Sequence, residues 1–264
     1  MKFTTAIILT VLCAAAAFGQ KGVVPFIDVK SGGLLGGFEN GRFLDAKTTF
    51  GKLKGEQSYT LFGIKGKVGE ATVTVEAPDE PCDEFYYGKI ELDVKQGLAI
   101  GANRSWNPVP RPPRAIDLRD KTYLGVVSGI LRAKGQPKAR AVLEQAVKVD
   151  LDGDGTDEVI LTASSYAGNI KPSAAPNDYS FVVVRKVVGG RARNIFLAEE
   201  YVKKAIEFGA PSRFEVSAIA DLDGDGKMEI VVYGEYYEGS GASVYRINGA
   251  KAAEIKLLET GCGV

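Results

Sequence analysis

The sequence predicts a mainly β protein, with an N-terminal β region, a C-terminal part made of antiparallel β repeat units, and one amphipathic helix. Three observations predict this class. Short apolar stretches alternate with glycine-containing turns from Val24 to about Gly101. A proline-rich segment interrupts the chain at residues 107–113. A unit of strand, acidic loop and strand then occurs twice, with Asp150 of the first copy aligned to Asp221 of the second.

The first residues, 1–19, are typical of a secretory signal peptide. Lys2 precedes an apolar run over residues 6–18, and a small residue, Gly19, follows the run. We expect cleavage near Gly19 or Gln20. The run is shorter than the ~20 residues that a helix needs to cross a bilayer, which favours a secretory signal over a retained anchor.

Lipid anchoring is a weaker alternative, because Leu12 is large for the residue that precedes a lipoprotein cysteine such as Cys13. Lysine plus arginine equals aspartate plus glutamate, with 33 of each, so no basic excess points to nucleic acid. The sequence therefore predicts a secreted or periplasmic protein with no membrane span and no nucleic-acid partner.

The N-terminal β region is expected over residues 20–106. Asn40-Gly41 lies between apolar residues and favours a tight hairpin, because both turn positions tolerate positive φ. Alternation of apolar and polar residues predicts further half-buried strands around Val73, Val75, Ile90, Leu92 and Val94.

A proline-rich linker is expected at residues 107–117, since proline lacks the backbone donor and restricts the residue before it. The helix follows, from about Asp120 to Lys134, with Asp120 as its N-cap and Gly135 as its stop. Its apolar side chains recur at three- and four-residue spacing, which predicts ordinary core packing.

Residues 118–264 hold this helix and the two copies of the repeat. The pattern Asp-Leu-Asp-Gly-Asp-Gly begins at Asp150 in one copy and at Asp221 in the other, and strand-like sequence follows each. Gly189-Gly190 and Asn248-Gly249 are predicted as turns between the later strands of the two copies.

The acidic loops carry the clearest chemistry. Calcium takes six to eight oxygens, and alternate residues of a tight loop can aim carboxylates at one point. Side-chain oxygens are expected from the acids at positions one, three, five and nine, and a backbone carbonyl from position seven. The predicted ligands are Asp150, Asp152, Asp154, Thr156 and Glu158 in the first loop, and Asp221, Asp223, Asp225, Lys227 and Glu229 in the second.

These loops differ from an EF-hand, which has an acid at position twelve, where this chain has Leu161 and Val232. An acid at position nine followed by a β-strand resembles the loops of FG-GAP and VCBS-type repeats, known from β-propellers such as integrin heads and from exported bacterial proteins. The resemblance covers roughly residues 142–239 and implies propeller-blade-like units that bind calcium. Two such units are fewer than the four blades or more that a closed propeller has.

The proline-rich linker, the acidic loops and the Gly261-Cys262-Gly263 ending also resemble a group of bacterial secreted proteins with such repeats, and no activity follows from that resemblance. The competing interpretation of the loops is a pair of polar turns without metal. Four carboxylates within nine residues repel one another unless a cation offsets them, and this favours calcium.

The composition excludes several kinds of catalysis. The chain has no histidine, which removes serine and cysteine triads with histidine and the histidine-containing zinc sites. Nucleotide-binding P-loops are absent from the sequence. A polymer hydrolase with acidic catalysts remains the alternative function, with candidates Glu199, Glu200, Glu235 and Glu238.

Two further groups of residues are open to more than one interpretation. Tyr233, Tyr236 and Tyr237 could form an aromatic ledge for a glycan or protein ligand, although strand alternation favours core packing of at least one. Cys82 and Cys262 could form a disulfide in an oxidising compartment or remain two buried thiols. The function predicted first is a secreted, non-enzymatic, calcium-binding module with a structural or binding role.

Overall fold

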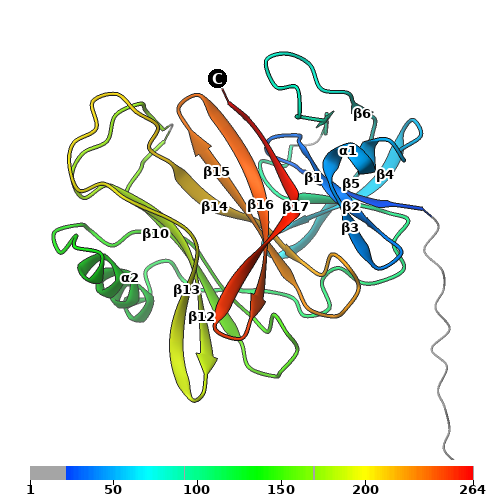
Figure 1. Cartoon of the computed structure of the whole chain (residues 1–264). Coiled ribbons are helices and arrows are strands. Elements are labelled where there is room, and N and C mark those ends of the chain that lie inside the picture. Colours follow the sequence, from blue (N-terminus) through cyan, green and yellow to red (C-terminus); the bar gives the residue numbers. More distant parts are fainter. Residues whose placement is uncertain (1–21, 92, 169, 264) are drawn as a thin grey trace, which may run out of the picture.

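The computed structural model describes residues 22–263 except residues 92 and 169. The predicted signal peptide at residues 1–19 lies outside these residues and stays a prediction. Among the described residues, no helix has the length and apolar character that a membrane span needs. The chain is mainly β, as predicted, and its strands form three larger antiparallel sheets and one small one (Figure 1).

The N-terminal sheet has six strands in the order β3-β2-β1-β8-β4-β5. Its hairpin between β2 and β3 turns at Asn40 and Gly41, whose φ angles of 50° and 78° confirm the predicted turn. The strands are β1 (Val24–Asp28), β2 (Leu34–Glu39), β3 (Arg42–Leu44), β4 (Gln57–Gly63), β5 (Gly66–Val73) and β8 (Leu98–Gly101).

The remaining elements of this half are short. They are α1 (Ala46–Phe50) and the two-stranded sheet of β6 (Val75–Glu76) and β7 (Tyr87–Gly88). The strand predicted around Ile90 and Val94 is absent: these two residues belong to no strand, and Leu92 lies outside the described residues. The sequence prediction also missed α1, whose single turn begins at Asp45, the N-cap that accepts a hydrogen bond from Thr48 N at 2.6 Å.

Each copy of the repeat folds into a four-stranded antiparallel meander. The first copy gains an edge strand, β9, from the end of the predicted linker. Its strands are β9 (Arg114–Ala115), β10 (Leu143–Val149), β11 (Glu158–Ser164), β12 (Tyr179–Val188) and β13 (Arg191–Tyr201). The second copy has β14 (Arg213–Ala220), β15 (Glu229–Tyr236), β16 (Gly239–Asn248) and β17 (Lys251–Gly263). Over the described residues, none of the sheets closes into a barrel.

The turn between β12 and β13 lies at Gly189-Gly190, as predicted, with φ of 59° and 74°. The turn between β16 and β17 is shifted by one residue from the predicted Asn248-Gly249. Asn248 pairs with Lys251, so the turn residues are Gly249 and Ala250, and Gly249 supplies the positive φ of 58°.

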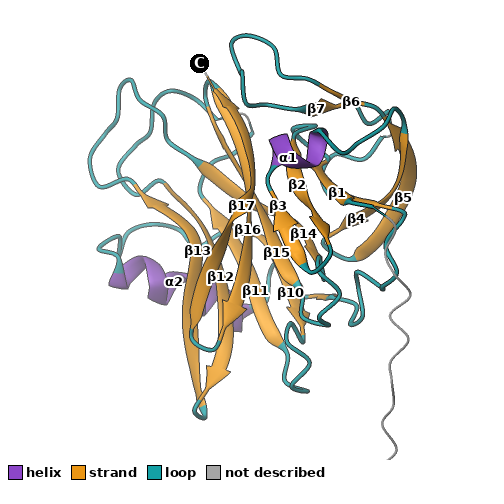
Figure 2. Cartoon of the chain, turned by 45° about the vertical axis from the view of Figure 1, so that its right-hand side comes forward, coloured by secondary structure: helices purple, strands orange, loops and turns teal. Residues whose placement is uncertain are grey.

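Helix α2 (Lys121–Ala133) confirms the predicted helix. The side chain of Asp120 accepts a hydrogen bond from Thr122 N at 2.8 Å, as an N-cap does. Val127, Ile130 and Leu131 are buried against the first repeat sheet in a core that includes Leu161 and others. The apolar side of the helix therefore packs against the first repeat sheet, and Figure 2 shows the helix beside that sheet.

The sheets are stacked so that each core is shared between neighbours. The two repeat sheets face each other across one core, to which Val182 and Val184 of β12 contribute. The second repeat sheet turns its other face to the N-terminal sheet, where Phe26 and Leu98 meet Val244. The order across the molecule is α2, first repeat sheet, second repeat sheet, N-terminal sheet (Figures 1 and 2).

Two further features join the N-terminal region to the repeats. Cys82 and Cys262 form a disulfide, with Cα atoms 5.5 Å apart, that links the N-terminal region to β17. Of the two interpretations of these cysteines, the disulfide is therefore the correct one. Trp106 and Val109 pack against the core shared by the N-terminal and second repeat sheets. The division of the chain into an N-terminal β region at residues 20–106, a linker at 107–117 and a repeat region at 118–264 stays a prediction.

Candidate metal centres

The two acidic loops occupy equivalent places in the two meanders. The first connects β10 to β11 and the second connects β14 to β15. The leucine at position two of each loop points into the protein: Leu151 is 2% exposed and Leu222 is fully buried. Burial of these leucines, together with the buried strands on either side of each loop, thus fixes the position of the loops.

The first aspartate organises each loop through backbone amides. Asp150 accepts hydrogen bonds from Gly153 N at 2.7 Å and from Gly155 N at 3.0 Å. Asp221 does the same with Gly224 N at 2.7 Å and with Gly226 N at 2.9 Å. All four glycines have φ between 77° and 84°, a region that side chains disfavour. Backbone geometry therefore explains why glycine occupies these four positions.

Three predicted acids converge in each loop. One carboxylate oxygen from each of Asp150, Asp152 and Glu158 lies within 4.8 Å of the other two. In the second loop the corresponding set is Asp221, Asp223 and Asp225. The two sets share positions one and three and differ in the third member.

The other predicted ligands have local partners. Asp154 accepts a hydrogen bond from Thr156 N at 2.7 Å, and Asp225 accepts one from Lys227 N at 2.7 Å. Glu229 is fully buried and accepts from Leu222 N at 2.9 Å. The backbone carbonyls of Thr156 and Lys227 remain predicted ligands.

A basic side chain that the sequence prediction missed reaches into the first loop. The Lys186 ammonium nitrogen lies 2.5 Å from Glu158 Oε1 and 2.8 Å from Asp152 Oδ2, and its side chain is 7% exposed. The same nitrogen lies 3.9 Å from Asp154 Oδ2. Lys186 continues the buried face of β12 that carries Val182 and Val184, which explains why the charge is held inside the protein.

Arg246 has the equivalent position in the second copy. Its Nη2 atom lies 2.6 Å from Glu229 Oε1 and 2.7 Å from Asp223 Oδ2, and its Nη1 atom lies 3.8 Å from Asp225 Oδ2. The four carboxylates of the first loop face Lys186 and Arg111, whose Nε atom lies 4.0 Å from Asp150 Oδ2, and the four of the second face Arg246. Each loop therefore retains a negative excess when all four acids are ionised.

The register of the sheets explains why these two residues correspond. Val159 pairs with Arg185 of β12 and Ile230 pairs with Tyr245 of β16, so the next residue on β12 and on β16 lies across from the acid at position nine. The connection between these two strands is longer in the first copy. A constant offset between the copies therefore cannot align Lys186 with Arg246, although a search for a basic residue on the second strand after each loop could have found both.

Burial and charge act in opposite directions on the acids. Burial raises the pKa of Glu158, and Lys186 offsets this only in part. Burial also tends to raise the pKa of Asp152, but the hydrogen bond and charge of Lys186 outweigh it and lower that pKa. In the second loop, burial raises the pKa of Glu229 to about 8 despite the neighbouring Arg246. Additional positive charge would therefore stabilise the ionised form of the buried glutamates.

One oxygen in the first loop fits the expected cation. Asp152 Oδ1 is buried and has no hydrogen-bond partner among the described residues. Asp152 belongs to the converging set with Asp150 and Glu158, and the donor set is oxygen only. Oxygen donors with several carboxylates are the ligands that calcium and magnesium prefer, so the residues of the loop fit a hard divalent cation.

The acids proposed for hydrolysis have other partners. Glu199 pairs with Lys134 at 2.6 Å, Glu200 accepts from Ser212 N at 3.0 Å, and Glu235 lies 3.2 Å from the ammonium group of Lys30. Glu238 is exposed. Nothing in these contacts favours a catalytic pair.

The three tyrosines are distributed between core and surface. Tyr233 is 5% exposed and belongs to the shared core, which confirms that at least one of them packs inside. Tyr237 is 51% exposed, and Tyr236 has intermediate exposure. The contacts of these residues therefore lend no support to a glycan or protein ligand.

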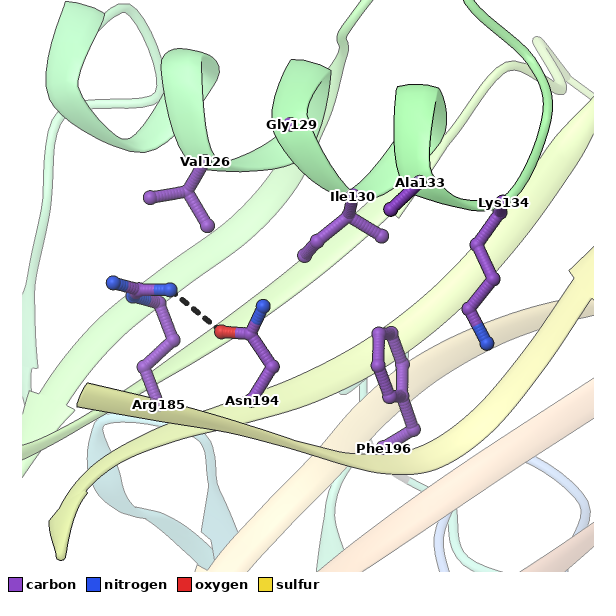
Figure 3. Close-up of a pocket in the computed structure, with 8 residues that line it drawn as sticks. All are labelled: Val126, Gly129, Ile130, Ala133, Lys134, Arg185, Asn194 and Phe196. Carbon is purple, nitrogen blue, oxygen red and sulfur yellow. Dashed lines mark hydrogen bonds between the residues drawn. The ribbon is translucent and has the colours of Figure 1, made fainter. Parts of the chain in front are cut away.

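A groove of about 350 Å³ lies between α2 and the strands β12 and β13 (Figure 3). Gly129 and Ala133 leave space on the helix, and Phe196 faces them from β13. On the sheet side of the groove, Arg185 of β12 donates a hydrogen bond to Asn194 Oδ1 of β13 at 2.6 Å. Arg185 lies next to Lys186 on β12 and points to the opposite face, so the groove and the first acidic loop lie on different faces of the same sheet.

Comparison of the chain with protein-family models, with curated proteins and with solved structures found no match.

Proposed function

We propose that the protein is an exported, non-enzymatic β-repeat module that binds calcium in its two acidic loops, and that calcium stabilises the stack of sheets. The repeats are proposed to be of the FG-GAP or VCBS type, on the resemblance of their loops. The observation that carries the proposal is the buried, unpartnered Oδ1 of Asp152, a residue whose carboxylate converges with those of Asp150 and Glu158. The bridge between Cys82 and Cys262 supports a periplasmic or extracellular location, since disulfides persist in oxidising compartments.

The place of the loops supports a structural role for the ion. Each loop joins two strands whose side chains build the shared cores, and Leu151 and Leu222 are buried in those cores. An ion that holds a loop closed therefore holds the ends of these strands. Extracellular calcium modules bind at ~10⁻⁴ to 10⁻³ M, and a tenfold excess of ion over the dissociation constant adds ~1.4 kcal/mol per site.

The test is thermal unfolding of the chain from residue 20, stripped of metal by a chelator and then measured with and without 5 mM calcium, about ten times the middle of that affinity range. We expect calcium to raise the melting temperature, and the double variant Asp152→Ala with Asp223→Ala to lose that rise. The matched control is Glu56→Ala with Glu238→Ala, which removes the same charge from exposed positions outside the loops. An unchanged melting temperature of the unmodified chain would refute the proposal.

A further inference from the structure

The segment between the N-terminal sheet and the first repeat crosses the second acidic loop. The indole N–H of Trp106 donates to the backbone oxygen of Asp221 at 2.9 Å, and Asp221 N donates to Pro108 O at 2.7 Å. A Cβ atom added to Gly224 would lie 3.2 Å from the indole ring, so the ring covers the turn of the loop. The backbone N–H and C=O groups of Asp221, the first predicted ligand of the second loop, are thus both hydrogen-bonded to this segment.

The same segment then reaches the first loop through Arg111. Its Nε atom donates to Asp150 O at 2.5 Å, and its Nη2 atom donates to Leu151 O at 3.0 Å. Nη2 also donates to Gly226 O of the second loop at 2.5 Å. One guanidinium group therefore binds the backbone of both loops at once.

A direct bond between the loops reinforces this bridge. Met228 N, near the end of the second loop, donates to Leu151 O at 2.8 Å. Leu151 O thus accepts from Arg111 of the connecting segment and from Met228 of the other loop. Asp150 is a predicted ligand and Gly226 precedes Lys227, whose carbonyl is another, so the bridge holds the backbone at a ligand residue of the first site and next to one of the second.

We propose that Arg111 couples the two candidate calcium sites, so that an ion in one loop raises the affinity of the other; this inference rests on the proposed calcium binding. An ion that closes the first loop fixes Asp150 O and Leu151 O, and Arg111 and Met228 then have their partners in place. The second loop loses less conformational freedom when it binds its own ion, which gives positive cooperativity. By linkage, the second site affects the first by the same factor.

Tryptophan emission provides a readout of one site. Trp106 is the single tryptophan of the chain and contacts the second loop. Calcium titrations of the metal-stripped chain, followed by this emission, measure the affinity of the second site. Four proteins are compared: the unmodified chain, Asp152→Asn, Arg111→Lys, and the double variant. Lysine keeps the positive charge of Arg111 and loses the planar fork that reaches both loops.

We expect Asp152→Asn to weaken calcium binding at the second site about fivefold when Arg111 is present, the lower end of the usual range for coupled sites. In the Arg111→Lys background the same substitution should have little effect. An equal effect in both backgrounds would overturn coupling through Arg111, because long-range charge alone is unchanged by the lysine.

Calorimetry separates this inference from the function on which it rests. Two bound ions per unmodified chain, with an emission-derived affinity that Asp152→Asn leaves unchanged, would overturn the coupling and leave the calcium proposal standing. No heat of binding in the unmodified chain would overturn both. The comparison of the unmodified chain with Asp152→Asn retains Arg111, so an unchanged affinity there refutes the coupling even if Arg111→Lys does not fold.

Discussion

The two acidic loops have nearly the same sequence and different surroundings. In the first loop the side chain of Asp150 is 16% exposed and that of Asp154 is 49% exposed. In the second loop Asp221 is 2% exposed, and Trp106 covers the turn. The second loop also lies near the N-terminal sheet. The guanidinium carbon of Arg246, whose side chain binds this loop, is 5.8 Å from the ring centre of Phe43 in β3.

The loops also differ in how their carboxylates are satisfied. Asp223 Oδ1 accepts from Asp225 N at 3.2 Å, whereas the equivalent Asp152 Oδ1 has no hydrogen-bond partner among the described residues. The arginine of the second copy presents several donors in a planar fork, and the lysine of the first is a compact charge. The carboxylate at position three therefore has one oxygen without a hydrogen-bond partner in the first loop, whereas both of its oxygens are bonded in the second. Residues on a neighbouring strand contribute to that difference.

The largest expected effect comes from removal of the internal cations. Lys186→Met leaves Glu158 and Asp152 without their buried partner, and loss of one member of a buried pair costs about 3 kcal/mol. In chelator, urea unfolding should show this loss for Lys186→Met and a loss of similar size for Arg246→Met. Calcium should restore more stability to Lys186→Met than to Arg246→Met. The first loop has the unpartnered oxygen, and the substitution removes the lysine charge that competes with calcium there.

The control for this experiment is Lys148→Met, an exposed lysine on β10. It should change the free energy of unfolding little, with or without calcium. If calcium restored Arg246→Met more than Lys186→Met, the order of the two loops as cation sites would be reversed.

The next effect concerns the share of each loop in calcium-dependent stability. Asp152→Asn should remove about 1.4 kcal/mol of the stabilisation measured at a tenfold excess of calcium over its dissociation constant. Asp223→Asn should remove less, because the second loop already bonds its oxygens to Arg246 and to backbone amides. Urea unfolding of each single variant, with calcium and with chelator, measures both losses. Equal losses would show that the surroundings do not rank the sites.

Local chemistry made much of this structure predictable. Asn40-Gly41 and Gly189-Gly190 turn where they were expected, since few residue pairs tolerate positive φ at both positions. The acidic loops were identified because their glycines and acids are close in sequence. The helix was found from its cap at Asp120 and from its apolar spacing.

The partners of the loops could not be predicted in the same way. Lys186 is far from Glu158 in sequence and meets it through strand register, and the longer connection in the first copy hides its correspondence with Arg246. The prolines of residues 107–113 exclude regular structure and say nothing about packing, so the contacts of Trp106 and Arg111 with the loops were not foreseen. In both cases the missing information is long-range contact.

The smallest expected effect tests the covering of the loops. Gly153 and Gly224 have φ of 78° and 77°, so alanine at either position costs about 1 kcal/mol through the backbone alone. A Cβ on Gly153 would lie 3.4 Å from Arg111 Nη1, the end of a flexible side chain, whereas a Cβ on Gly224 would lie 3.2 Å from a rigid ring. Gly224→Ala should therefore unfold at a lower urea concentration than Gly153→Ala. Its free energy of unfolding should be lower by up to about 1 kcal/mol, because the added methyl group overpacks against the ring.

Gly155→Ala, with φ of 84° and no atom within 4 Å of an added Cβ, is the control for the backbone cost. Equal losses for Gly153→Ala and Gly224→Ala would mean that the indole yields as readily as the arginine, and that the second loop is less firmly covered than its contacts indicate.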